Sequence, residues 1–170
     1  QDGKIRLEEY RMDFDKDDRW TSFSVAKSLV STLVGAAIKD GFIKSIDDPL
    51  TDYISELKGS GYDGVSVKQL LTMTSGVKWN EDYADAKSDV ALFNNTKPVD
   101  GVDPVIVYMK TLTNEAEPGT RWQYNTGETN LIGVLVAKAT GKTISEYLSE
   151  KVWAPYGMSQ DGEWLLNEGG

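Results

Sequence analysis

The residues best placed to do chemistry in this chain are Ser24 and Lys27, which stand three positions apart in a sequence with no histidine and no cysteine. Without imidazole or thiol groups, a nucleophile must be a hydroxyl that a lysine, a tyrosine or a carboxylate activates. If a helix begins here, both side chains lie on one face, one turn apart. The serine hydroxyl would then lie within reach of an amine.

The residues around Lys27 favour a role for this lysine as a base. A lysine normally keeps its proton at neutral pH, but desolvation between apolar side chains lowers the pKa of an amine. A serine in the first turn of a helix also faces free backbone N–H groups, which favour the negative charge that develops during acyl transfer. The alternative is that Ser24 has a purely structural role, as an ordinary helix cap. The apolar neighbours expected to enclose the amine are Phe23, Val25, Leu29 and Val30.

Two other Ser-x-x-Lys pairs occur, Ser55 with Lys58 and Ser75 with Lys78. The pattern alone is weak, because about one chance occurrence is expected in a chain with this much serine and lysine. The segment after Ser55 runs into glycines and is typical of a solvated helix end, while the glycine directly after Ser75 disfavours a helix start. Only Ser24 precedes a long apolar helix.

The composition indicates a globular chain of about one domain. With 170 residues, 39% of them hydrophobic, the chain is long enough to bury a core. The net charge of -9 argues against a nucleic-acid partner and an anionic membrane surface, and no apolar run is long enough for a membrane span. No cluster suits zinc or calcium, so neither metal nor cofactor is expected. Residues 1–4 do not resemble a targeting segment, which leaves the bacterial cytoplasm and the periplasm both open.

The hydrophobic pattern places the serine between a strand and a mostly helical region. Residues 4–12 alternate as a strand does. A helix is expected from Ser24 to Lys39, ending at Gly41, with apolar residues almost all round and therefore at the centre of the fold. The segment 76–104 is expected to be irregular and functional. Further helices are expected from Ile46 and over 66–73, 105–112, 128–140 and 145–153.

Four segments together carry a resemblance to a known family. They are FSVAKS at 23–28, IDDPL at 46–50, LLTMTSG at 70–76 and PGTRWQY at 118–124. In this order and at these intervals they resemble the serine β-lactamase and penicillin-binding-protein superfamily, in its class C β-lactamase-like branch of esterases and amide hydrolases. The runs 75–83 and 124–130 are further similar to the 6-aminohexanoate-dimer (nylon oligomer) hydrolase type.

The resemblance implies an α/β (α+β) fold of the β-lactamase-like, transpeptidase-like type and a serine hydrolase activity. It implies Ser24 as the acylated nucleophile, Lys27 as its base and Tyr124 as a second proton-transfer group, with Tyr83 and Thr126 as substrate-binding residues. Thr126 stands where the family frequently has an asparagine, which disfavours penicillins. The expected substrates are small amides or esters, linear amide oligomers above all. The alternatives are a penicillin-binding protein or β-lactamase and a D-alanyl-D-alanine peptidase.

The resemblance also implies that residues 1–170 are one part of a domain about twice as long. Residues 1–23 would supply the strand region of its α/β part, and residues 24–170 most of its helical part with the first two motifs. The third motif and most of the sheet would follow Gly170, so the expected partner is this missing carboxyl-terminal half, and the segment alone is expected to be inactive. An alternative of another class is a non-catalytic scaffold, or a fragment that pairs with a complementary chain.

Overall fold

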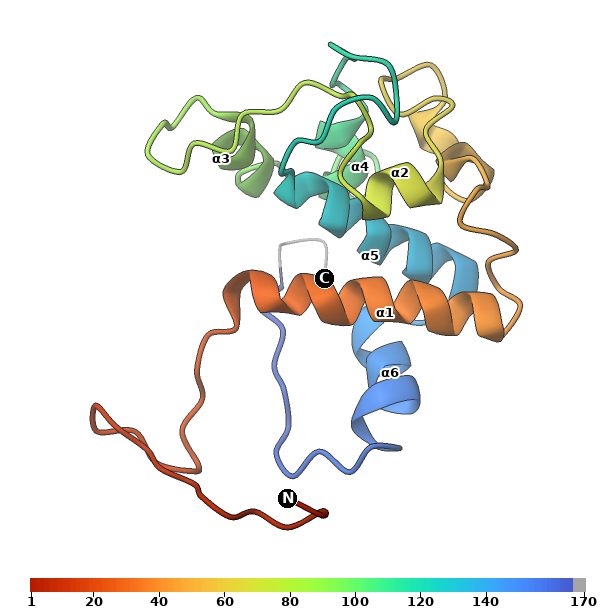
Figure 1. Ribbon diagram of the computed structural model, residues 1–170. Coiled ribbons are helices and arrows are strands. Elements are labelled where there is room, and N and C mark those ends of the chain that lie inside the picture. Colours follow the sequence, from red (N-terminus) through yellow and green to blue (C-terminus); the bar gives the residue numbers. More distant parts are fainter. Residues whose placement is uncertain (167–170) are drawn as a thin grey trace.

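The computed structural model describes residues 1–166, and regular structure in this range is helical (Figure 1). Three short 3-10 turns cover Phe23–Val25, Leu50–Asp52 and Ser55–Leu57, and a π-helical turn, Ser149–Trp153, continues α6. Among the described residues, no helix has the length and apolar character that crossing a membrane requires. The α-helices are α1 (Ala26–Lys39), α2 (Val67–Leu71), α3 (Asp89–Asn94), α4 (Pro104–Met109), α5 (Thr126–Thr140) and α6 (Ile144–Leu148).

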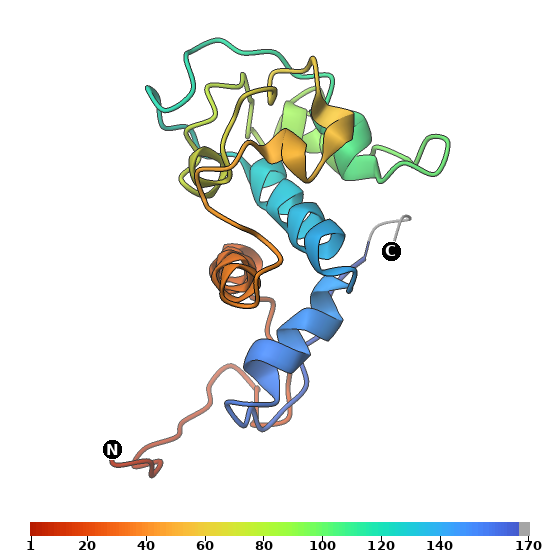
Figure 2. The ribbon, with the colours of Figure 1, turned by 90° about the vertical axis from the view of Figure 1, so that its right-hand side faces the viewer.

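Helix α5 forms the centre of this arrangement. It packs against α1, α2 and α4 and also contacts α3 and α6. Figure 1 shows α1 and α5 side by side, with α2, α3 and α4 beyond α5, and Figure 2 gives the view along α1. The packing of α5 on α1 brings the start of one helix near the start of the other. The core between the helices includes Leu33 and Val34 of α1, Leu131 and Leu135 of α5 and Met109 of α4.

Local capping explains where most of the described helices begin and where α5 ends. The Ser66 hydroxyl accepts the N–H of Gln69, whose side chain in turn accepts the N–H of Ser66, and this capping box starts α2. Asn125 caps α5 at its start, and Gly141, with a φ of 70°, ends it. The helices expected over 66–73, 105–112, 128–140 and 145–153 all form, with ends that differ by a few residues.

Helix α1 is buried along one stripe, so the expectation of burial almost all round is wrong. Val30, Leu33, Val34 and Ala37 are buried, while the opposite face, which includes Gly35, is exposed. The main cover of α1 comes from α5 and α6, which leaves part of its surface bare. The central helix is therefore α5 and not α1.

Residues 4–12 do not form the expected strand. The segment runs away from the helices, and Leu7 is 82% exposed (Figures 1 and 2). A strand needs a neighbour with which it exchanges backbone hydrogen bonds, and within residues 1–166 no segment pairs with this one. The segment has the alternating pattern of a strand, but among the described residues it does not join a sheet.

Two further expectations differ in detail from the structure. The segment 76–104 is not irregular throughout, because Ser88 caps the short helix α3 within it. The helix expected from Ile46 begins only at Leu50, as a 3-10 turn. Its delay has a local cause, since the Asp48 carboxylate accepts hydrogen bonds from the N–H of Ser45 and the hydroxyl of Tyr53.

Candidate active site

Ser24 lies in the 3-10 turn that leads into α1, one turn before Lys27. The Nζ atom of Lys27 is 3.1 Å from the Oγ atom of Ser24, within hydrogen-bonding distance. Ser24 is exposed and Lys27 is half-buried. The structure thus brings the serine and the lysine of the motif together, as their spacing on one helical face predicts.

Tyr124 reaches the same oxygen from a distant part of the chain. It directly precedes Asn125, the cap of α5, and its hydroxyl is 2.8 Å from Ser24 Oγ. The Lys27 ammonium also lies 5.2 Å from the centre of the Tyr124 ring. A serine hydroxyl therefore stands between an amine and a phenol, each within hydrogen-bonding distance.

The surroundings of Tyr124 lower its pKa. Burial alone raises the pKa of this phenol, but hydrogen bonds with Ser24 and Lys27, together with the positive charge of Lys27, outweigh that effect. A phenol with a lowered pKa gives up its proton more readily at neutral pH. Tyr124 is therefore equipped to take part in proton transfer at Ser24.

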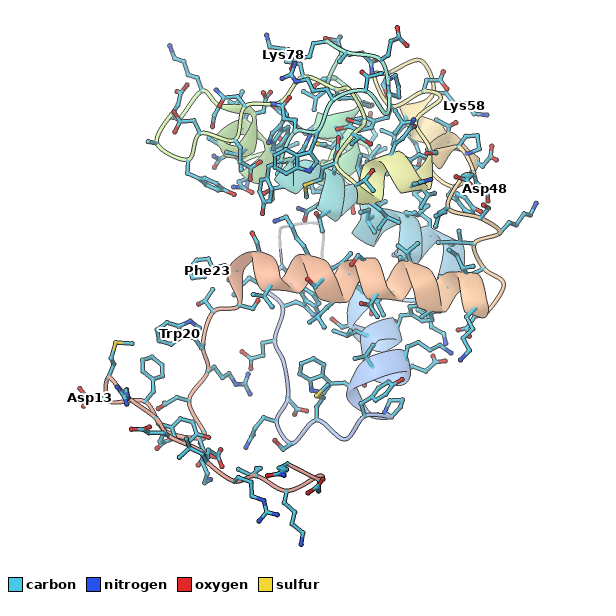
Figure 3. All side chains as sticks on the ribbon, viewed as in Figure 1. Asp13, Trp20, Phe23, Asp48, Lys58 and Lys78 are labelled. Atoms are coloured by element: carbon cyan, nitrogen blue, oxygen red, sulfur yellow. The ribbon has the colours of Figure 1, made fainter. Side chains whose placement is uncertain are left out.

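The apolar enclosure expected around the lysine is only partly present. Phe23 and Val25 are 79% and 69% exposed, Leu29 is half-buried, and Val30 is buried. Figure 3 shows Phe23 pointing outward from the amino-terminal end of α1. The backbone of Phe23 has a φ of 45°, a conformation that bulky residues rarely adopt. Strained residues of this kind cluster at active sites and ligand-binding segments.

A second cluster, which the sequence interpretation missed, centres on Glu81. Its carboxylate accepts hydrogen bonds from the N–H of Thr126 at 3.0 Å and the Tyr83 hydroxyl at 2.6 Å, and also from the Thr126 hydroxyl and the Trp79 indole. Burial raises the pKa of Glu81, but these hydrogen bonds bring it below its usual value. Glu81 therefore ties the loop before α3 to the start of α5, two residues from Tyr124.

The two predicted substrate-binding residues belong to this cluster. The Tyr83 hydroxyl is 3.3 Å from Thr126 Oγ1, and Tyr83 is 69% exposed. The structure therefore brings Tyr83 and Thr126 together beside Tyr124. Glu81 had one signal in the sequence, its place in the run 75–83 that carries part of the family resemblance. Within residues 1–166, no group of three or more histidine, cysteine, aspartate or glutamate residues could hold a metal ion.

The rival serines have other partners. The Ser75 hydroxyl is buried, donates to Glu128 and accepts the N–H of Val77 at 3.1 Å. The Ser55 hydroxyl lies 3.4 Å from the carboxylate of Glu56. Figure 3 shows the lysines of both rival pairs, at 58 and 78, far from the start of α1. The Ser24 motif is thus the one that the structure builds into a serine and lysine site.

Comparison with known proteins gives matches along most of the chain. Residues 1–162 match the family described as Beta-lactamase. The 6-aminohexanoate-dimer hydrolase of Paenarthrobacter ureafaciens is 36% identical over 173 residues, which cover 99% of this chain and 44% of that protein. A β-lactamase of Pseudomonas fluorescens is 25% identical over 79% of this chain and 34% of its own length. A solved class C β-lactamase superposes with a TM-score of 0.63 and 25% identity, over 80% of this chain and 34% of its own. The chain thus spans less than half the length of these relatives.

Proposed function

Because the chain belongs to the β-lactamase family, we propose that it is the nucleophile-bearing part of a serine hydrolase that cleaves small amides or esters. One observation carries this proposal, the position of Ser24 Oγ between Lys27 Nζ at 3.1 Å and the Tyr124 hydroxyl at 2.8 Å. A hydroxyl with a base in reach, and a further group beside that base, is the arrangement that nucleophilic catalysis requires.

In the first step, Ser24 Oγ attacks the carbonyl carbon of the substrate, and the hydroxyl proton passes to the Lys27 and Tyr124 pair, in which we assign Lys27 Nζ the role of the base. The carbonyl oxygen takes up negative charge, which the positive end of the α1 dipole favours. The bond to the leaving group then breaks, and the leaving nitrogen or oxygen takes its proton through Tyr124. The products are an ester on Ser24 and a free amine or alcohol.

In the second step, water hydrolyses this ester. A water molecule attacks the acyl carbon and passes a proton to the Lys27 and Tyr124 pair, which returns a proton to Ser24 Oγ as the ester bond breaks. A carboxylic acid leaves, and the site is restored. Atoms and charges balance with water as the only co-reactant.

The proposed substrates are linear amides of the kind that the name of the Paenarthrobacter relative describes. In the family, an asparagine frequently follows two residues after the tyrosine, whereas this chain has Thr126, whose hydroxyl is bonded to Glu81. We expect this exchange to disfavour penicillins. Tyr83 is exposed beside Thr126, with its hydroxyl bonded to Glu81, and we propose that both Tyr83 and Thr126 contact the substrate.

We further propose that the active protein contains a carboxyl-terminal part that completes the domain. Two observations support this, the 44% coverage of the 6-aminohexanoate-dimer hydrolase and the exposure of the alternating segment 4–12. Residues 1–23 would then join the sheet of the completed domain, and residues 24–170 would form its helical part. The substrate binds where the two parts meet, beside Ser24.

Hydrolysis assays on the protein extended beyond Gly170 test the proposed function. The extended protein and its Ser24→Ala variant are incubated with the 6-aminohexanoate dimer and with a penicillin, and amine release and ring opening are followed. We expect amine release by the protein and a loss of at least about 10³-fold in the variant. Equal rates in both would refute Ser24 as the nucleophile, and binding without turnover would favour the non-catalytic scaffold. Faster opening of the penicillin would refute only the proposed substrate class.

A further inference from the structure

Glu128 carries a buried carboxyl group that the proposed mechanism does not use. It is 1% exposed and lies in the first turn of α5, three residues after the cap Asn125. Its Oε1 atom accepts a hydrogen bond from the Ser75 hydroxyl and lies 3.4 Å from the side-chain nitrogen of Asn125. Its backbone N–H donates to the Asn125 side-chain oxygen at 3.1 Å. Glu128 and Asn125 are therefore bonded to each other in both directions.

The residue before Tyr124 and the residue after it are each held by hydrogen bonds. Gln123, the residue before Tyr124, donates its N–H to the carbonyl of Met73 at 3.0 Å. Asn125, the residue after Tyr124, is held through Glu128 to Ser75. Met73 and Ser75 both belong to the turn that follows α2. This turn therefore fixes the backbone of Tyr124 from both sides.

Burial raises the pKa of the Glu128 carboxyl to about 8, against the opposing effect of hydrogen bonding with Ser75 and Tyr62, and so favours the neutral form at neutral pH. The Tyr62 hydroxyl and Glu128 Oε2 are both buried, yet neither makes a well-formed hydrogen bond among the described residues. Glu115 and Arg121 line the same small cavity as Glu128 and pair with each other at 2.8 Å. Asp89 adds negative charge near Tyr62. An ionised Glu128 would therefore stand in a buried site, and the cation that lines the same cavity, Arg121, already has an anionic partner.

We propose that Glu128 is a positioning residue for Tyr124, because its contacts with Ser75 and Asn125 hold the start of α5 against the turn after α2. The proposal rests on the proposed role of Tyr124 in proton transfer. Burial of the ionised carboxylate is costly even where it accepts hydrogen bonds, so ionisation favours opening of the turn to water. Opening at this point would move Asn125 first and the Tyr124 hydroxyl with it, away from Ser24 Oγ.

Nuclear magnetic resonance of the Tyr124 ring tests this proposal without relying on catalysis. The protein extended beyond Gly170 is labelled with ¹³C at the hydroxyl-bearing ring carbon of tyrosine, and the Tyr124 signal is assigned by its loss in Tyr124→Phe. The signal is followed between about pH 6 and about pH 10, which spans both ionisations. We expect two steps in the protein, one from Tyr124 itself and one near pH 8 from Glu128. Glu128→Gln stays neutral and should lose only the second step, whereas Glu117→Gln, at an exposed site, should keep both.

An identical titration of Tyr124 in the protein and in Glu128→Gln would overturn the proposal. If Glu128→Gln does not fold, Ser75→Ala takes its place, because this variant removes the hydroxyl that donates to Glu128. A Tyr124 signal at neutral pH that is the same in Ser75→Ala as in the unchanged protein would then overturn the proposal. Labelling of Ser24 by a fluorophosphonate is measured on the same samples and should slow above about pH 8 in the protein but not in Glu128→Gln. A complete lack of labelling would count against the proposed function alone, since the titration still decides whether Glu128 positions Tyr124.

Discussion

The three side chains of the proposed site are held in place in different ways. Ser24 and Lys27 belong to one helical turn, so the distance between them follows from the local backbone. Tyr124 reaches Ser24 only because α5 packs on α1, and its backbone position depends on contacts made by its neighbours. Tyr124 is therefore the member of the site most sensitive to changes elsewhere in the molecule.

Replacement of Tyr124 by phenylalanine tests its role in proton transfer to the leaving group. We expect Tyr124→Phe to slow amide hydrolysis by about 10²- to 10⁴-fold, the usual contribution of a general acid or base. A nitrophenyl ester, whose leaving group needs no proton, should lose much less. Steady-state rates on both substrates measure the difference. An equal loss on amide and ester would indicate that Tyr124 only orders the site.

Neutralisation of Glu81 is expected to change the ionisation of Tyr124. The negative charge of Glu81 raises the pKa of Tyr124, so Glu81→Gln should lower that pKa further. The Tyr124 ring-carbon signal would then show its own ionisation at a lower pH than in the unchanged protein. The matched control is Glu117→Gln, which should leave this step in place. A step that moves to higher pH would show that Glu81 acts on Tyr124 through hydrogen bonds rather than charge.

At the scale of the elements, the turn after α2 is the part that organises the site. The carbonyl of Met73 in this turn accepts the N–H of Gln123, and the Ser75 hydroxyl donates to Glu128. At Gly76 the turn packs against the segment around Ala116. Gly76 has a φ of 76°, and a Cβ atom there would overlap the carbonyl group of Ala116. The turn therefore requires glycine both for its conformation and for space.

Substitution of Gly76 should cost more stability than substitution of an equivalent glycine in open space. Gly64 has a φ of 81°, and no atom lies near the position that a Cβ would take. Gly64→Ala should therefore lower the free energy of unfolding by about 1–2 kcal/mol, the cost of a left-handed conformation for a residue with a Cβ. Gly76→Ala adds a steric clash with backbone and should lower the free energy of unfolding by more. Urea unfolding curves of both variants give the comparison. Similar costs would mean that the Ala116 segment moves aside freely.

The sequence allowed prediction of those elements whose ends depend on neighbouring residues. From the sequence, one helix is expected to start at residue 66 and another to end at residue 140. The structure has caps at Ser66 and Gly141, and a cap acts over only three or four residues. The burial of α1 and the strand over 4–12 were predicted wrongly, because each depends on a partner element that the local pattern does not specify. The alternation of apolar and polar residues over 4–12 suits a strand, but a strand also needs a neighbouring strand, which this local pattern does not provide.

The same distinction separates the site residues that were found from those that were missed. Ser24 and Lys27 could be paired from their spacing, and Tyr124 from the family resemblance. Glu81 bonds to a residue 45 positions away and Glu128 to one 53 positions away, and no periodicity in the sequence joins such pairs. The resemblance itself, based on four segments, is confirmed by the match over residues 1–162.

At the scale of the whole molecule, the amino-terminal segment runs away from the packed helices (Figures 1 and 2). Every residue from 1 to 25 is exposed, including apolar ones such as Ile5 and Trp20, of which Figure 3 labels Trp20. Such apolar exposure is unusual for a stable surface and suits a segment that another part of the domain covers. This agrees with the proposal that a carboxyl-terminal part completes the fold.

Limited proteolysis should reveal this difference between the segment and the helices. In the chain of residues 1–170, we expect a non-specific protease to cut first between residues 1 and 22, because exposed backbone outside regular structure is cleaved most readily. In the protein extended beyond Gly170, the same segment should resist cleavage. Mass spectrometry of early fragments locates the cuts. Equal cleavage in both proteins would contradict the proposed pairing of the segment with a sheet.

The central claim is that Ser24 is an activated nucleophile, and the most direct test is intact-mass spectrometry after incubation with a fluorophosphonate. Four samples are compared, the chain of residues 1–170 and the protein extended beyond Gly170, each with and without Ser24→Ala. We predict one adduct on the extended protein, little on the chain alone, and none on either Ser24→Ala variant. An extended protein that gains no adduct, or a Ser24→Ala variant that gains the same one, would contradict the claim.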